Sequence, residues 1–154
     1  MIRITNTQRR FTIKTGMIKK ATQAMLNELG YSRFDIGILF CGTTAMAQYN
    51  GTYRNKHKAT DVLSFPYHDT LKAGEVIVPA TPDDANLGDI ILCPLVIDKK
   101  RHDWNRSFDY HCIVLVAHAI AHLLGHDHES DSDYLIMQKV EDRLLEAVRR
   151  KLKK

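Results

Sequence analysis

The chain has 154 residues, of which 44% are hydrophobic and 26% charged, and its formal net charge is +4. This composition excludes a disordered polar tail and a strongly basic, histone-like protein. The length fits one domain over residues 1–154 whose core needs no disulfide bonds. Basic runs near both ends, such as 149–154, fit either solvated helix ends or an RNA contact.

The three cysteines, Cys41, Cys93 and Cys112, stand singly in apolar stretches without CxxC spacing. We therefore expect reduced, buried thiols in a reducing compartment. The first ten residues lack the apolar region of a signal peptide, and no apolar run approaches the ~18 residues of a membrane span. These features predict a cytoplasmic protein without a membrane partner.

The first half of the chain alternates short apolar runs with helical periodicity. Apolar residues recur at helical spacing from Thr15 to Leu29, and Gly30 provides a stop. The elements predicted up to residue 66 are strand material at 2–4 and 11–13, a helix at 15–29, a strand at 35–41, a helix at 43–54 that frays near Gly51, and a strand at 60–66.

A polar loop precedes the second half, which is mainly helical. We expect a strand at 87–93, a helix from Pro94 to about Trp104, an apolar and therefore buried helix at 107–124, and a last helix from about Ser132 to Leu152. Together these elements predict an α+β fold. A small mixed sheet carries helices on one face, and a central buried helix carries metal ligands in a zincin-like arrangement.

The stretch HAIAHLLGHDH, residues 118–128, contains four of the eight histidines. Four helical residues turn through about 400°, so His118 and His122 project from the same face. Gly125 can adopt the positive φ that ends a helix and returns the chain, which places His128 as a third ligand. Three imidazoles with an open position are typical of a catalytic site for one zinc ion.

Two other residues of this stretch, His126 and Asp127, are polar. His126 lies next to the turn and is not expected to be a ligand. Asp127 either orients the second nitrogen of a ligand or stabilises the turn. The spacing HxxxHxxGxxH is that of metzincin peptidases, but these carry a glutamate base at the position of Ala119. A zinc peptidase lacking this base therefore remains an alternative.

The full string resembles the bacterial rRNA maturation RNase family of the YbeY type, whose motif is close to HGxLHLxGYDH. The chain departs from it at Ala119, Ala121 and His126, and no departure removes a ligand. The segments YRNKHKATDVLSFP (53–66, with Ala59 in place of proline), LGDIILC (87–93) and MQKVEDRLL (137–145) also resemble the family. The resemblance covers residues from about 48 to 145.

This resemblance implies a metal-dependent endoribonuclease that cuts single-stranded RNA in rRNA maturation and ribosome quality control. It implies zinc ligands at His118, His122 and His128, a basic active-site residue at Arg54, and partners in the small ribosomal subunit or its assembly factors. A guanidinium suits phosphate because it offers paired donors, although a surface salt bridge is the alternative for Arg54.

The strand DVLSFP would line the site, with Ser64 and Phe65 as substrate-groove candidates. Phe65 could stack a base or pack in the core. Hydroxide on the metal, Asp127 and Glu129 are the candidates for the general base. A non-catalytic assembly factor stabilised by metal is the second alternative. The sequence does not indicate an oligomeric state.

Overall fold

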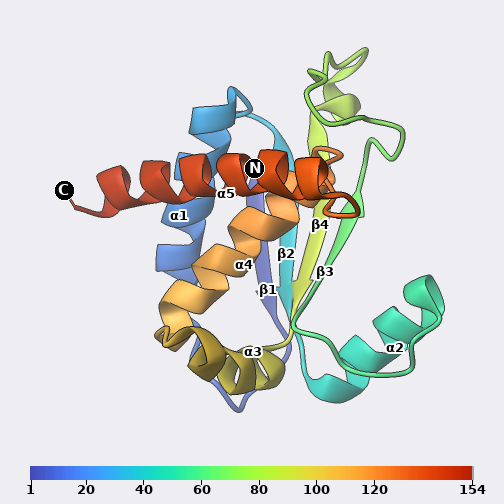
Figure 1. The fold of residues 1–154 in the computed structure, drawn as a ribbon. Helices are drawn as coiled ribbons and strands as arrows, with labels where there is room; N and C mark the ends of the chain where they lie inside the picture. The colour runs from blue at the N-terminus through green and yellow to red at the C-terminus, as the bar shows by residue number, and fades with distance from the viewer. Residues whose placement is uncertain (154) are drawn as a thin grey trace.

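A four-stranded mixed sheet lies at the centre of the computed structural model, which describes residues 1–153 (Figure 1). Lys154, the last residue of the C-terminal basic run, lies outside the described residues. In chain order the elements are β1 (Ile2–Asn6), α1 (Thr15–Leu29), β2 (Asp35–Phe40), α2 (Thr43–Arg54), β3 (Val62–Pro66), β4 (Asn86–Leu92), α3 (Pro94–Lys100), α4 (Phe108–Leu123) and α5 (Asp131–Leu152). Short 3-10 turns cover Pro82–Asp84 and Arg101–Trp104.

The strand order is β1-β2-β4-β3, with the first three strands parallel and β3 antiparallel at the edge. Side chains alternate between the two faces of each strand. Ile36, Ile38 and Phe40 of β2 point into the main core, where they meet apolar side chains of α1, α4 and α5. The mixed sheet and the buried central helix agree with the predicted α+β class. The zincin-like character stays a prediction.

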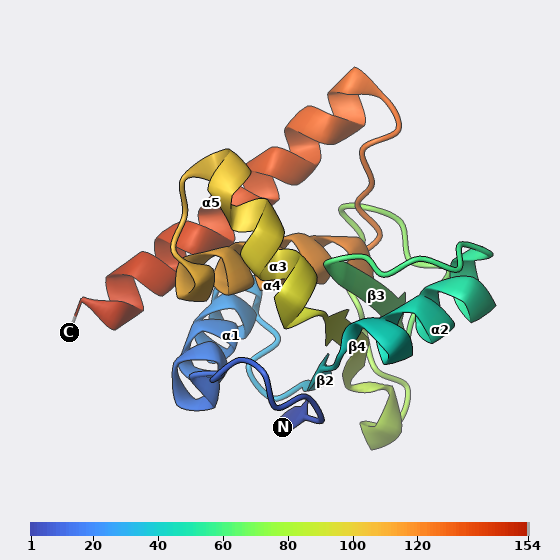
Figure 2. The same cartoon turned by 90° about the horizontal axis from the view of Figure 1, so that it is seen from below.

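Helices cover both faces of the sheet, which corrects the expectation that they share one face. α2 packs against the second face, where Met46 joins Leu63 and Ile91 in a separate apolar cluster. Figure 2 shows α4 and α5 on one side of β3 and β4, and α2 on the other. The three cysteines are buried and unpaired, as predicted, and burial raises the pKa of the Cys112 thiol to about 12.

Two local predictions were wrong. Residues 11–13 form no strand, because the side chain of Gln8 bonds both the N–H and the carbonyl of Phe11 and so occupies groups that a ladder would use. α2 does not fray at Gly51, since the missing Cβ leaves room for the ring of His57 and the helix continues to Arg54. Among residues 1–153, no helix is long and apolar enough to cross a membrane.

Candidate metal centre and its cleft

The end of α4 and the turn after it bring three imidazoles together. His118 and His122 lie one turn apart on α4, and their ring centroids are 4.6 Å apart. Gly125 has φ +88°, as predicted, and a Cβ there would overlap the backbone carbonyl of Leu71. The turn directs His128 back, so that its ring lies 5.9 Å from His118 and 5.4 Å from His122.

Hydrogen bonds to Nδ1 fix the tautomers of the two helical histidines. His122 Nδ1 donates to the carbonyl oxygen of His126 at 2.9 Å, and His118 Nδ1 donates to Glu141 Oε1 at 2.5 Å. Both Nε2 atoms therefore carry lone pairs, and they face each other at 3.1 Å. Two facing lone pairs repel unless a cation lies between them. This donor set fits a metal ion.

The separations also suit zinc. One ligand atom from each of His118, His122 and His128 lies within 4.8 Å of the others. Zn–N bonds of ~2.1 Å at tetrahedral angles place nitrogen atoms about 3.4 Å apart. Burial, and then the like charge of His118, lower the pKa of His122, which keeps its ring in the neutral form that binds metal. The three histidines could thus hold one ion.

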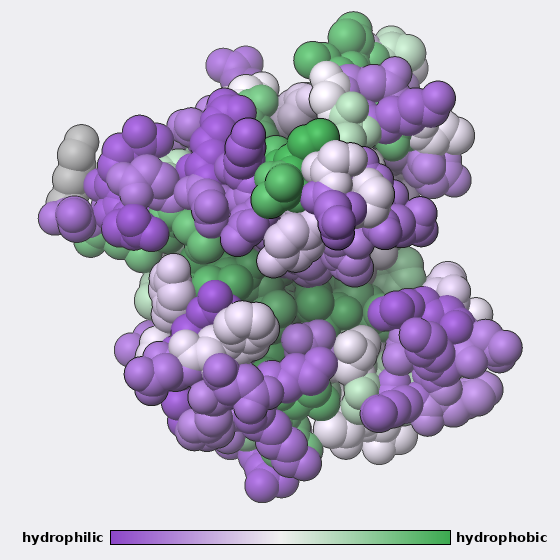
Figure 3. Space-filling view, in the orientation of Figure 1, coloured by the Kyte–Doolittle hydropathy of each residue, from purple (hydrophilic) through white to green (hydrophobic). Residues whose placement is uncertain are grey.

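A cleft of about 420 Å³ opens beside these histidines, between α4, β3 and the end of α2. Arg54, Ser64, Ala119, Asp127 and Glu129 are among the residues that line it. In Figure 3 the outer surface is largely hydrophilic, and hydrophobic residues are visible in a recessed band below α5 and at the top of the view. The cleft thus combines the histidines with one guanidinium and with carboxylates.

The structure places the remaining predicted site residues as follows. Ser64 lines the cleft, whereas Phe65, the next residue of β3, points to the other face and contacts the ring of Tyr53 at 4.8 Å. Asp127 Oδ1 accepts a hydrogen bond from Glu129 N at 3.3 Å, which suits the turn-stabilising alternative. The ring of His126 is buried outside the ligand group, and burial lowers its pKa.

Glu141 is the contact that the sequence did not predict. It lies on α5, 23 residues after its partner His118, because α5 crosses α4 at this point. The segment 137–145 was noted only as a point of resemblance. A carboxylate here fixes the orientation of the His118 ring and leaves its Nε2 free to bind an ion.

Comparisons with known proteins agree with the motif. The family model described as endoribonuclease YbeY matches residues 3–149. Human endoribonuclease YbeY is 34% identical over 150 residues, covering 96% of this chain and 88% of the human protein. The protein of the same name from Bartonella bacilliformis is 36% identical, and the match covers 84% of this chain and 79% of that protein. The one from Finegoldia magna is 32% identical, and the match covers 96% of this chain and 94% of that protein.

The solution structure of TM1509 from Thermotoga maritima has a similar fold, with a TM-score of 0.59 and 20% identity over 97% of this chain and 93% of that one. The sequence relatives and the family match cover nearly the whole chain, including the histidine motif. On this basis, the chain belongs to the YbeY endoribonuclease family.

Proposed function

We propose that this protein is a zinc-dependent endoribonuclease that cuts single-stranded RNA in rRNA maturation and ribosome quality control. The observation that carries the proposal is the cleft in which His118, His122 and His128 converge beside Arg54. Family membership supports the substrate class, since the relatives are named endoribonucleases. The proposed setting is the cytoplasm, with the small ribosomal subunit or its assembly factors as partners.

His118, His122 and His128 would hold the ion. Zinc bound there would supply a Lewis acid that polarises a phosphoryl oxygen and lowers the pKa of water. The protein contributes the orientation of the ligands. Glu141 and the carbonyl of His126 fix the His118 and His122 rings, so that both direct Nε2 toward one centre.

Arg54 binds the phosphate that is cut. Its guanidinium can donate two parallel hydrogen bonds to phosphoryl oxygens and stabilises the negative charge that develops on them. None of the ion pairs within residues 1–153 involves Arg54, so its guanidinium is not already paired with a carboxylate. Ser64 offers a hydroxyl on the β3 side, and Asp127 and Glu129, which line the same cleft, are the carboxylate candidates for the general base.

The test compares metal content and RNA cleavage in the same preparations. Purified protein is expected to bind about one zinc per chain and to cut a single-stranded rRNA fragment, with cleavage lost on chelation. His122→Ala should lose both properties. The matched control is His102→Ala, which removes an exposed histidine on the turn Arg101–Trp104.

Three results would contradict the proposal in different ways. Full zinc retention in His122→Ala would refute the ligand assignment. Cleavage of casein with RNA left intact would favour the zinc peptidase. Binding to precursor ribosomal particles without cleavage of either substrate would favour a non-catalytic assembly factor.

A further inference from the structure

A second groove lies on the opposite face of β3 from the metal cleft. Its volume is about 570 Å³, and its walls come from α2 and from the part of the second sheet face that α2 leaves open. Because side chains alternate along β3, Ser64 lines the metal cleft while its neighbour Phe65 lines this groove. The edge strand β3 therefore separates two hollows that open on either side of it.

The floor of the groove contains one row of residues that crosses all four strands. The strand register aligns Arg3 with Gly37, Gly37 with Asp89, and Asp89 with Phe65. Gly37 has no side chain, and a Cβ there would overlap the carboxylate of Asp89, which lies over it. Within residues 1–153 this exposed carboxylate has no ion-pair or hydrogen-bond partner, so it is free to accept hydrogen bonds from a ligand.

Aromatic rings line the side of the groove nearest α2. Tyr49 and Tyr53 come from α2 and Phe65 from β3, and the rings of Tyr53 and Phe65 meet edge to face. The side chain of Tyr53 is accessible to a ligand, because the residue is 64% exposed. Exposed rings beside a groove can stack nucleobases of any sequence, since every base has a π face.

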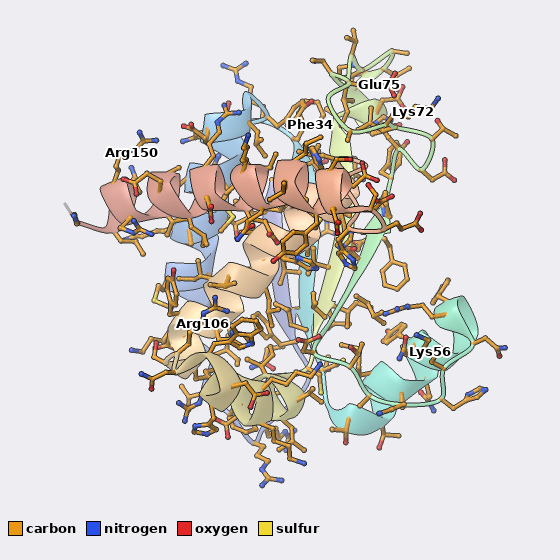
Figure 4. The ribbon with its side chains drawn as sticks, in the orientation of Figure 1. Phe34, Lys56, Lys72, Glu75, Arg106 and Arg150 are labelled. Carbon is orange, nitrogen blue, oxygen red and sulfur yellow. The ribbon has the colours of Figure 1, made fainter. Side chains whose placement is uncertain are left out.

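The end of α2 connects this groove with the metal cleft. Tyr53 lines the groove and the next residue, Arg54, lines the cleft. Lys56 and Lys58 follow in the same exposed segment, and no ion pair within residues 1–153 involves either lysine. Figure 4 shows Lys56 at this end of the molecule, far from Arg106 near the start of α4. The junction between the two hollows thus carries the Arg54 guanidinium, and the two lysines add positive charge to the exposed segment that follows it, as a phosphate backbone requires.

We propose that this groove binds the base of a nucleotide next to the phosphate that is cut. The inference rests on the proposed function, because it assigns the RNA strand a path from the metal cleft across Arg54 and around the edge of β3. Tyr53 stacks the base, and Asp89 accepts hydrogen bonds from its edge. Guanine fits best, since its N1–H and exocyclic amine present two adjacent donors to one carboxylate.

The experiment uses the full-length, zinc-loaded protein and short single-stranded oligoribonucleotides that carry 2-aminopurine beside the cleavage site. Binding is followed by fluorescence anisotropy and quenching, and cleavage by the products. Tyr53→Ala should weaken binding and raise KM by about 5- to 150-fold, because stacking one base is worth ~1–3 kcal/mol. Tyr53→Phe, which keeps the ring, should restore binding. The control is Tyr110→Ala, an exposed tyrosine near the start of α4.

Each result separates the groove from the metal centre. If wild type cuts RNA and Tyr53→Ala behaves like Tyr110→Ala, the groove proposal is overturned while the nuclease stands. If wild type binds RNA without cutting it and Tyr53→Ala weakens binding, the groove stands and the nuclease fails. Absence of RNA binding overturns both.

Asp89→Asn provides a second test that does not depend on stacking. The amide retains one acceptor but replaces the other with a donor, so a preference for guanine over uracil at the flanking position should disappear. An unchanged ratio of binding constants for the two bases would remove Asp89 from the proposal.

Discussion

Replacing Glu141 should weaken zinc binding without removing a metal ligand. Glu141 Oε1 accepts a hydrogen bond from His118 Nδ1, and the bond is charge-assisted because the acceptor is a carboxylate. Loss of such a partner typically costs 10- to 100-fold in metal affinity, or about 1.4–2.7 kcal/mol. Glu141→Ala removes both the charge and the acceptor, so we expect the upper end of this range. Glu141→Gln retains an acceptor oxygen, so we expect about tenfold.

The assay is competition for zinc with a chromophoric chelator at about pH 7.5, above the ordinary histidine pKa of about 6.5. Circular dichroism establishes that each variant is folded. The matched control is Asp142→Asn, which removes one carboxylate from the next, exposed position of α5. If Glu141→Ala binds zinc as tightly as Asp142→Asn does, the carboxylate does not support the His118 ligand and the reasoning fails.

Three further variants test the turn, the cleft and the core. Gly125→Ala should lower the unfolding free energy by about 1–3 kcal/mol because of its positive φ, whereas Gly16→Ala in open space on α1 should not lower Tm. Arg54→Ala should reduce kcat about 10²-fold with zinc content unchanged, and a normal kcat would refute its role. Burial, and then the charge of Arg106, lower the pKa of His111, so the unfolded state gains a proton first as pH falls. The free energy of unfolding should therefore decrease as the pH falls below about 6.5, and it should decrease less steeply in His111→Gln. Equal pH dependence in the variant and the wild type would contradict this.

Local patterns predicted most of the elements because their causes are local. Apolar spacing defined α1 to the residue, and the predicted helix at 107–124 differs from α4 by one residue at each end. The strand predicted at 11–13 was wrong because the local sequence pattern does not reveal that the side chain of Gln8 forms hydrogen bonds with the backbone of Phe11. The side of the sheet that α2 covers depends on tertiary packing in the same way.

In the candidate site, too, the features set by local sequence were predicted and those set by tertiary packing were not. The three histidines lie within eleven residues, so helix geometry and one glycine turn are enough to predict that they meet. The partner of His118 comes from another helix, and no spacing rule links positions 118 and 141. Ser64 and Phe65 were both predicted as groove candidates of this site, but alternation along β3 directs them to opposite faces. Which face carries the cleft is decided only by how α4 docks against β3.

Ala119 explains why the cleft suits a phosphodiester better than a peptide. The residue is 1% exposed and lines the cleft between the two helical ligands, so a glutamate there would have to bury its carboxylate beside apolar neighbours. Burial of such a group without a partner costs several kcal/mol. A peptide bond needs a positioned acid–base group, because its amine is a poor leaving group. Cleavage of a phosphodiester instead builds negative charge on oxygen, which a guanidinium stabilises directly. With a methyl group at 119 and Arg54 in the same lining, the cleft lacks the carboxylate that a peptidase carries at this position and provides a guanidinium instead.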